Sequence, residues 1–359
     1  MKQKRLPALL LLSLAIFQAC KKDNDEPSKE KETIGVYVLF EGSWGQNNSG
    51  IAWYNMKTGQ SDPNYFKTVN GYDLGEGAQD LEQYGSKMYC VVSGTQGEKK
   101  SFLEVINPLT GKSLKRIPFF DANTEYMPRS IAFAGSKAYI SGFDGKITRI
   151  DTASLAVDGR LDAGRFLEGI TVANGKIYAA NSDYYYTGDE TTVSVVDIST
   201  FKKLYEMEVG ANPTKIATAT NGDVYVVLAG NNSAPAAFKK IDSKTDKVTA
   251  SYNYAIGSLA LSESKSLVNI NPYNLPEIKS FDLTTGALGS NFISDGTVVA
   301  LPYSINFNSL NGDVLIGDSK SYSSTTGEAL CFSSEGKLKF KFTTAATNPS
   351  RAVFIYGNK

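Results

Sequence analysis

A short pattern recurs along the chain: an apolar run, a tight turn containing Gly, Ser or Asn-Gly, and a second apolar run. Clear copies begin at Ile131, Ile170, Ile216 and Ile305, and weaker copies begin at Leu81 and Leu259. Turns of this kind between apolar runs are typical of β-hairpins. A hairpin that repeats at a fixed spacing indicates a propeller or a solenoid.

A second tight turn follows a third apolar run in each unit. Its seven copies begin at Asn55, Asn107, Asp151, Asp197, Asp242, Asp282 and Ser333. Asp and Asn side chains bind the turn backbone, and Gly adopts the positive φ that such turns need. Spread over residues 34–359, the copies give about 46 residues per unit, close to a four-stranded propeller blade. The sequence therefore predicts an all-β, seven-bladed β-propeller with four strands in each blade.

The two ends of the repeat region predict how the ring closes. The N-terminal unit begins at its second strand, Val36–Phe40, and the missing first strand is found at residues 349–356. Pairing of the C-terminal strand with the first blade removes the open sheet edges. An open solenoid is the main alternative architecture. Cys90 and Cys331 lie in strand runs two blades apart, so we expect buried thiols and no disulfide between them.

The first 33 residues have the features of a targeting signal followed by a tether. Lys2, Lys4 and Arg5 precede an apolar run too short to span a bilayer, which predicts a signal peptide over residues 1–19. The residues before Cys20 resemble a bacterial lipobox, which implies a lipidated cysteine; a secretory signal with a chance cysteine is the alternative. Residues 20–33 are charged and form an expected disordered tether. Its acidic stretch resembles the export signal of Bacteroidota surface lipoproteins, which implies an outer-membrane protein that faces the exterior and is held by its lipid alone.

Charge and composition exclude several classes of function. The chain has 37 basic and 37 acidic residues and no histidine. That balance argues against nucleic-acid binding, and the lack of histidine removes Ser–His triads and most zinc sites. No metal, cofactor or catalytic residue is expected, and the chain is not expected to be an enzyme. Glu76, Asp80 and Glu168 lie near the starts of inner strands, where propeller enzymes place acids, but such acids more often bind backbone amides.

The loops differ sharply between the two faces of the predicted ring. Loops after the first and third strands are uniformly tight, while those after the second and fourth strands are long and irregular. Irregular loops on a rigid scaffold usually carry function. The predicted ligand-binding residues on these loops are Trp44, Gln46, Asn47, Tyr72, Tyr126, Arg129, Phe166, Asn181, Tyr184, Tyr185, Asn231, Tyr273, Asn274, Tyr303 and Tyr322. Aromatic rings with amides suit a large, neutral, partly flat ligand; the alternative is that the tyrosines only pack the loops.

The repeat reads Pro-x-x-Ile, then Gly-x-x-Tyr-Val, then Ile-Asp-x-x-Thr-Gly, and it resembles the seven-bladed YVTN-type propellers over residues 34–359. With the lipobox, the acidic tether and the absence of histidine, the layout is similar to that of Bacteroidota surface cobalamin-binding lipoproteins. That resemblance implies capture of cobalamin, or a related corrinoid, and its transfer to a TonB-dependent outer-membrane transporter. Two other functions stay open: a polysaccharide-binding or polysaccharide-cleaving propeller, and a structural protein–protein interaction module.

Overall fold

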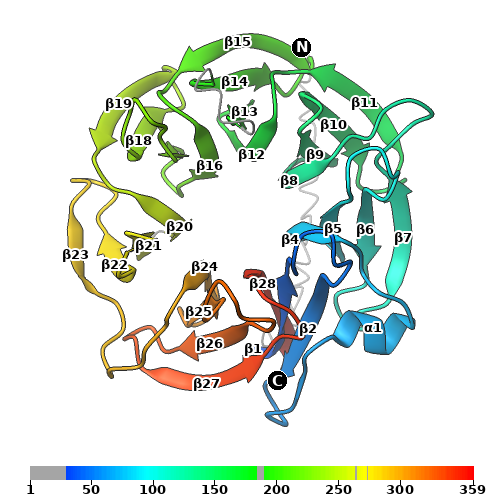
Figure 1. The fold of residues 1–359 in the computed structure, drawn as a ribbon, viewed down its shortest axis with the longest axis vertical. Coiled ribbons are helices and arrows are strands. Elements are labelled where there is room, and N and C mark those ends of the chain that lie inside the picture. The colour runs from blue at the N-terminus through cyan, green and yellow to red at the C-terminus, as the bar shows by residue number, and fades with distance from the viewer. Residues whose placement is uncertain (1–29, 184–189, 263–264, 273) are drawn as a thin grey trace, which may run out of the picture.

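The computed structural model describes residues 30–183, 190–262, 265–272 and 274–359. Seven antiparallel sheets, each of four strands, surround a central axis (Figure 1). This arrangement confirms the predicted seven-bladed propeller. One short helix, α1 (Tyr65–Asn70), lies outside β2 in the first blade and was not predicted.

The blades are numbered here from the N-terminus, and each is given from its inner to its outer strand. Blade 1 contains β28 (Pro349–Asn358), β1 (Lys31–Phe40), β2 (Gly50–Asn55) and β3 (Ser61–Asp62). Blade 2 contains β4 (Gly77–Tyr84), β5 (Lys87–Ser93), β6 (Phe102–Ile106) and β7 (Ser113–Pro118). Blade 3 contains β8 (Pro128–Ala134), β9 (Lys137–Gly142), β10 (Lys146–Asp151) and β11 (Val157–Asp162).

The remaining four blades follow the same plan. Blade 4 contains β12 (Leu167–Ala173), β13 (Lys176–Asn181), β14 (Thr192–Asp197) and β15 (Lys202–Glu208). Blade 5 contains β16 (Pro213–Thr218), β17 (Val224–Leu228), β18 (Ala237–Asp242) and β19 (Lys247–Tyr252). Blade 6 contains β20 (Ile256–Ala260), β21 (Ser266–Ile270), β22 (Glu277–Phe281) and β23 (Leu288–Asn291). Blade 7 contains β24 (Pro302–Phe307), β25 (Val314–Asp318), β26 (Glu328–Phe332) and β27 (Leu338–Thr343).

The ring closes through β28, as the sequence predicts. This C-terminal strand pairs antiparallel with β1, in a register that runs from Phe40 opposite Pro349 to Lys31 opposite Asn358. The pairing extends two residues beyond the predicted segment 349–356. Because β28 is the inner strand of a blade whose other strands are N-terminal, the two ends of the fold are held in one sheet.

Alternating side chains of the strands bind neighbouring blades together. On β1, Val36, Val38 and Phe40 are buried in a cluster that includes Leu315 of blade 7. Tyr37 and Leu39 on the other side of β1 are buried in a cluster that includes residues of blade 2, such as Leu81 and Cys90. Both faces of the sheet are therefore buried, which explains the continuous apolar runs of the sequence. Cys90 and Cys331 are buried free thiols, as expected.

Buried tyrosines on the second strands add polar contacts between blades. Tyr178 of β13 donates a hydrogen bond from its hydroxyl to the carbonyl of Ser243 in blade 5, at 3.2 Å. Tyr225 of β17 makes the equivalent contact with the carbonyl of Leu283 in blade 6, at 3.1 Å. Each hydroxyl thus finds an acceptor on the tight turn of the following blade, so these buried polar groups link neighbouring blades.

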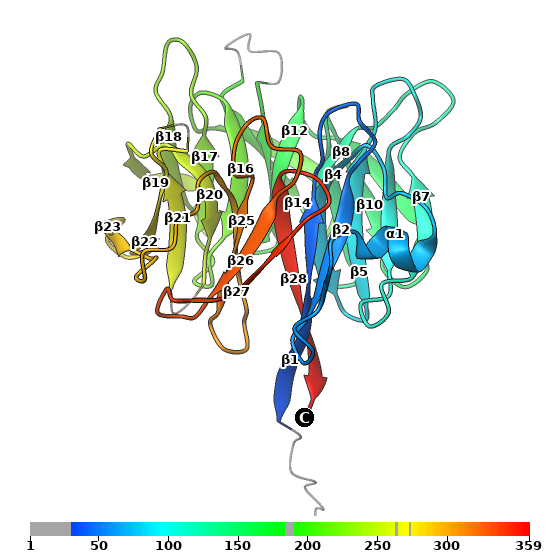
Figure 2. The same cartoon turned by 60° about the horizontal axis from the view of Figure 1, so that its bottom comes forward.

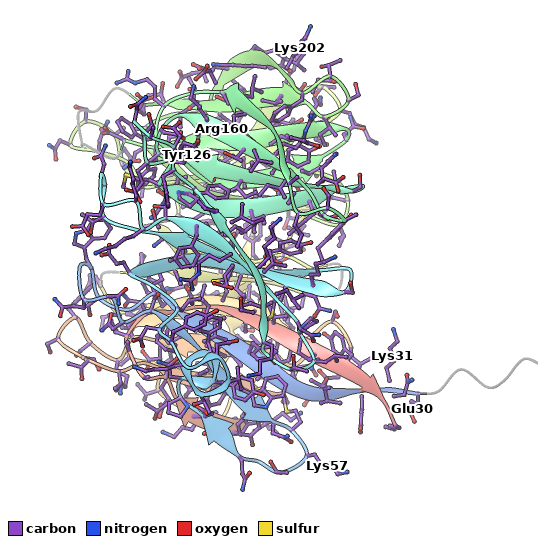
Figure 3. The ribbon with its side chains drawn as sticks, turned by 90° about the vertical axis from the view of Figure 1, so that its right-hand side faces the viewer. Glu30, Lys31, Lys57, Tyr126, Arg160 and Lys202 are labelled. Atoms are coloured by element: carbon purple, nitrogen blue, oxygen red, sulfur yellow. The ribbon has the colours of Figure 1, made fainter. Side chains whose placement is uncertain are left out.

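The two faces of the ring differ as the loop lengths predict. The long loops gather on one face, the loop face, and the tight turns on the other, the turn face (Figure 2). The paired ends of β1 and β28 project from the turn face as a two-stranded ribbon. Figure 3 shows Glu30 and Lys31 at this end, with Tyr126 and Arg160 on the opposite side of the molecule.

Candidate functional site: an axial cavity on the loop face

Two adjoining cavities lie on the propeller axis. The mouth cavity, about 400 Å³, opens toward the loop face and is lined by residues that include Trp44, Phe143 and Asn212. The channel cavity, about 240 Å³, lies between the inner strands and is lined by residues that include Lys215 and Arg351. Both cavities share the lining residues Glu41, Gln79, Arg129, Glu168 and Thr214.

An irregularity in the inner strands places these residues. Each of the seven inner strands has a shift of register near its start, as between Pro128 and Ile131 of β8 and between Pro213 and Ile216 of β16. A β-bulge re-aims side chains that would otherwise alternate across the sheet. Residues of the bulged segments line the channel cavity in every blade: Gln79, Arg129, Ser130, Glu168, Gly169, Thr214, Lys215, Ser258, Tyr303, Ser350 and Arg351.

The prolines of the repeat mark these bulges. Pro128, Pro213, Pro302 and Pro349 begin four of the inner strands, and the two residues after each proline face the channel. Proline lacks the N–H that a regular ladder needs, so it is tolerated at a strand start or a bulge. The x-x positions of the Pro-x-x-Ile pattern therefore supply the channel lining. This pattern is the signal in the sequence that points to Lys215 as a cavity residue, whereas Arg351 follows Pro349 in a Pro-x-x-Ala segment that departs from it.

Charged side chains bridge adjacent blades around the cavities. Arg129 of β8 donates from Nε and Nη2 to Oε1 of Glu168 on β12, at 3.0 and 2.6 Å. The Arg129 guanidinium also lies over the Phe143 ring, 4.4 Å from its centroid. An arginine that makes two hydrogen bonds and stacks on a ring has few accessible rotamers. Its remaining N–H groups are therefore held in a fixed direction.

Glu41 and Tyr303 form a second pair in the shared wall. Tyr303 donates from its hydroxyl to Oε2 of Glu41, at 2.7 Å. Burial raises the pKa of the Glu41 carboxyl, and the hydrogen bond from Tyr303 and the charge of Arg129 oppose that rise. Burial and the nearby Glu41 carboxylate raise the pKa of Tyr303 well above its usual value. The tyrosine therefore remains a hydrogen-bond donor at neutral pH.

The three acids weighed as catalytic candidates are all engaged by protein groups. Glu76 accepts hydrogen bonds from the backbone N and Oγ1 of Thr95, at 2.6 and 2.7 Å. Asp80 accepts from the backbone N of Ile131, at 3.0 Å, and Glu168 binds Arg129 as described above. Glu76 and Asp80 bind backbone amides, as expected for such acids, whereas Glu168 binds an arginine side chain instead.

A buried acid that sequence reasoning missed holds the loop between β5 and β6. Glu125 accepts hydrogen bonds from the backbone N of Lys99, Lys100 and Ser101, at 2.7, 3.0 and 2.9 Å. With the Glu76 contacts, two carboxylates fix this loop from both sides. The loop between β5 and β6 is therefore held in one conformation on the loop face, which reduces the entropy lost when a ligand binds there.

Of the predicted ligand-binding residues, Trp44, Arg129 and Tyr303 are brought together at the axis. Trp44 lines the mouth cavity with 66% of its surface exposed, and Tyr303 lines the channel cavity. Asn47 and Tyr72 instead line a separate cavity of about 650 Å³ at blade 2. That cavity also contains Arg116, whose guanidinium lies 3.7 Å from the centroid of the Phe102 ring.

Other predicted residues make contacts within the protein. Tyr126 lies under the guanidinium of Arg160, 3.3 Å from its ring centroid, and Phe166 meets Phe143 edge to face at 6.3 Å. Asn181 is 1% exposed, and its amide nitrogen donates to the hydroxyls of Thr192 and Ser194, at 2.8 and 3.0 Å.

The remaining predicted residues lie apart from these. Asn231 accepts hydrogen bonds from the backbone of its own loop. Gln46, Asn274 and Tyr322 are exposed on three different loops. Cys20, Tyr184, Tyr185 and Tyr273 fall outside the described residues.

Two features of the described residues concern metals and membranes. In residues 30–183, 190–262, 265–272 and 274–359, no three acidic or cysteine side chains gather into a metal site. Over the same ranges, no helix has the length and apolar character needed to cross a bilayer.

Solved structures share the fold at low sequence identity. A quinonprotein alcohol dehydrogenase-like protein from Bacteroides thetaiotaomicron is 15% identical, with a TM-score of 0.68 over 90% of this chain and 79% of that chain. Hydrazine synthase from Kuenenia stuttgartiensis is 13% identical, with a TM-score of 0.55 over 68% of this chain and 73% of that one. The computationally designed Ika8 protein is 14% identical, with a TM-score of 0.55 over 89% of this chain and 96% of that one. At these identities the likeness concerns the fold alone.

No curated protein matches this sequence. A family model does match, and it covers residues 34–304, which is most of the propeller. The chain therefore belongs to the family described as a domain of unknown function, DUF5074.

Proposed function

We propose that this propeller is a ligand-capturing protein whose binding site is the axial cavity on the loop face. The observation that carries the proposal is that all seven inner strands direct bulged residues into one space. A cavity with fixed polar groups and an aromatic rim is the usual form of a small-molecule site. In this proposal Trp44 and Phe143 contact the flat or apolar part of the ligand, and the shared wall binds its polar groups.

The polar wall suits a ligand with amide or hydroxyl groups. Arg129 and Glu168 neutralise each other, and Glu41 shares its hydrogen bond with Tyr303. Such pairs still offer further donors and acceptors, yet they present little net charge. Because the pairs are already formed in the free protein, a ligand meets groups that need little rearrangement.

We propose a corrinoid such as cobalamin as the first ligand to test. The support is the sequence resemblance to surface cobalamin-binding lipoproteins and the fit of a broad, amide-bearing ligand to an aromatic mouth with a polar wall. The proposal includes a lipid anchor at Cys20, an outer-membrane location facing the exterior, and transfer to a TonB-dependent transporter. The protein is proposed to bind and release its ligand without chemical change.

The position of the chain ends is compatible with this arrangement. The described chain begins at Glu30, next to the ribbon that projects from the turn face (Figure 2). A tether that precedes Glu30 would emerge from the turn face, opposite the mouth cavity. The loop face would then be free to meet a ligand or a partner.

Calorimetry with purified protein tests the proposed function. The visible spectrum of the protein as isolated is recorded first, since a bound corrinoid absorbs there. Cyanocobalamin and a panel of oligosaccharides are then titrated into wild-type protein. Saturable binding of cyanocobalamin supports the corrinoid proposal. Binding of an oligosaccharide alone favours the polysaccharide-binding alternative, and binding of neither leaves the protein-interaction alternative as the better account.

A further inference from the structure

Two of the three cations that line the channel cavity form ion pairs with carboxylates, and the third does not. Arg129 is bound to Glu168, and Arg351 donates from Nε to Oδ1 of Asp80 at 2.7 Å. Lys215, the third cation of the lining, donates from Nζ to the backbone carbonyl of Gly257. Among the ion pairs of the described residues, Lys215 has no carboxylate partner.

Lys215 is accessible at the wall of the channel cavity. It is exposed to solvent, and it lines the channel cavity between the inner strands. Partial desolvation by the channel walls lowers the pKa of Lys215, while the Glu41 carboxylate in the same cavity opposes that change. A lysine ammonium carries three N–H donors, so the bond to Gly257 and the lack of a carboxylate partner leave donors available for a ligand.

Two hydroxyl groups of the same wall also lack partners. Ser258 is 5% exposed, and its Oγ makes no hydrogen bond to protein; the buried Oγ of Ser350 is in the same condition. Buried hydroxyls are normally hydrogen-bonded, so each exception needs an explanation. Ser258 follows Gly257, whose carbonyl binds Lys215, so one of these hydroxyls lies on the bulge that receives the lysine.

We propose that the channel cavity binds an oxyanionic group of the ligand, a carboxylate or a phosphate, through Lys215 and the hydroxyl of Ser258. This inference rests on the proposed function and adds the chemical class of the group that enters the channel. An oxyanion would supply the negative charge that Lys215 lacks and the acceptor that Ser258 lacks.

The size of the cavity limits what can enter. Sites for drug-sized ligands measure roughly 300–1,000 Å³, whereas the channel cavity is about 240 Å³. The broad part of a ligand would therefore stay in the mouth cavity, at Trp44, and only a narrow arm would pass between Glu41 and Arg129 to reach Lys215. Lys215 would thus distinguish ligands that carry an acidic arm from those that do not.

Small anions test this inference without the whole ligand. Inorganic phosphate and acetate are titrated separately into wild-type protein, Lys215→Met and Ser258→Ala, with Lys244→Ala of the turn face as the matched lysine control. We expect at least one anion to bind wild-type protein, with affinity about tenfold lower in Lys215→Met and a few-fold lower in Ser258→Ala. Lys244→Ala should bind like wild type. If only phosphate binds, or only acetate binds, the result identifies the oxyanion that the site prefers.

The result that overturns the inference is equally direct. If neither anion binds wild-type protein, or if Lys215→Met and Ser258→Ala both bind as tightly as Lys244→Ala, the channel is not an oxyanion site. Melting temperatures identify a variant that has lost its fold, and Ser258→Ala keeps the test valid if Lys215→Met unfolds. A separate titration with cyanocobalamin distinguishes the two proposals. Loss of that binding in Trp44→Ala would leave the proposed function intact even where the anion result is negative.

Discussion

Arg351 and Asp80 form an ion pair of 2.7 Å between two inner strands, although they lie 271 residues apart in the chain. Arg351 belongs to the closing strand β28 and Asp80 to β4 of blade 2. Asp80 also accepts a hydrogen bond from the backbone N of Ile131 in blade 3, at 3.0 Å. One carboxylate therefore connects three consecutive blades at the axis, next to the point where the ring closes.

Removing the charge of Asp80 should destabilise the ring. In Asp80→Asn, Arg351 loses the carboxylate of its buried partner, and breaking a fully buried pair in this way costs about 3–5 kcal/mol. Since Arg351 is partly exposed, we expect a smaller loss, about 2 kcal/mol, in the free energy of unfolding measured with urea. Asp162→Asn is the control, because Asp162 is 86% exposed in its ion pair with Lys146 and should change stability by less than about 1 kcal/mol. Equal effects of the two variants would contradict the role given to Asp80.

Deleting the closing strand should have a larger effect. A chain without residues 349–356 lacks the inner strand of blade 1, which exposes the edge of β1 and the apolar surface of two blades. We expect a loss of several kcal/mol, a large share of the roughly 5–15 kcal/mol typical of a domain. Thermal unfolding measures it, with deletion of Lys359 alone as the control. An unchanged melting temperature in the longer deletion would show that closure does not depend on β28.

The contribution of Glu82 to stability should fall as the pH rises through the range in which this residue ionises. Burial and the neighbouring Asp80 carboxylate raise the pKa of Glu82 from 4.5 to about 7, against the opposing charge of Arg351. The folded state therefore holds this proton more tightly than the unfolded state, so the contribution of Glu82 falls between about pH 4.5 and pH 7 and changes no further above that range. Glu82→Gln, which has no charge to bury, should be more stable than wild type by on the order of 1–3 kcal/mol at pH 8.

That difference should shrink toward pH 5, where the wild-type carboxyl is protonated in the folded state. Urea unfolding of both proteins at pH 5 and pH 8 measures it. Glu98→Gln serves as the control, since Glu98 is 48% exposed, and its difference from wild type should depend little on pH. A constant difference between Glu82→Gln and wild type at the two pH values would be inconsistent with the raised pKa.

The proposed anchor has its own test. Cys20→Ala should release the protein from membranes, because the lipid is attached to that cysteine in the proposed maturation. Detergent partitioning of cell fractions distinguishes the two forms, with Cys90→Ala as the matched control. Continued membrane association of Cys20→Ala would rule out the anchor.

Much of the fold could be predicted from the sequence because its signals are local. Turn residues such as Asp242 and Asp282 act on the backbone within a few positions, and their repetition sets the number of blades. The split first blade was also visible, since Val36–Phe40 lacks a preceding strand. By contrast, helix α1 gave no clear periodic signal, because it is short and packs with only Phe66 fully buried.

The site was harder to predict because its contacts join distant parts of the chain. Tyr126 and Asn181 looked like ligand contacts, yet one packs on Arg160 and the other holds hydroxyls within blade 4. Local sequence gives no sign of such partners. Lys215 differs from these two residues, because the Pro-x-x-Ile pattern around it marks the position of a bulge. The structure adds that this bulge and the ring direct Lys215 to the channel cavity.

Titration of cyanocobalamin into wild-type, Trp44→Ala and Lys244→Ala proteins tests the central claim most directly, because Trp44 lines the mouth cavity and Lys244 lies in an exposed turn of the opposite face. Binding at the mouth predicts saturable binding to wild-type protein and a loss of about 2 kcal/mol in Trp44→Ala, roughly thirtyfold in affinity. Lys244→Ala should bind like wild type. Unchanged affinity in Trp44→Ala together with weakened affinity in Lys244→Ala would contradict the account, and would place the ligand on the turn face.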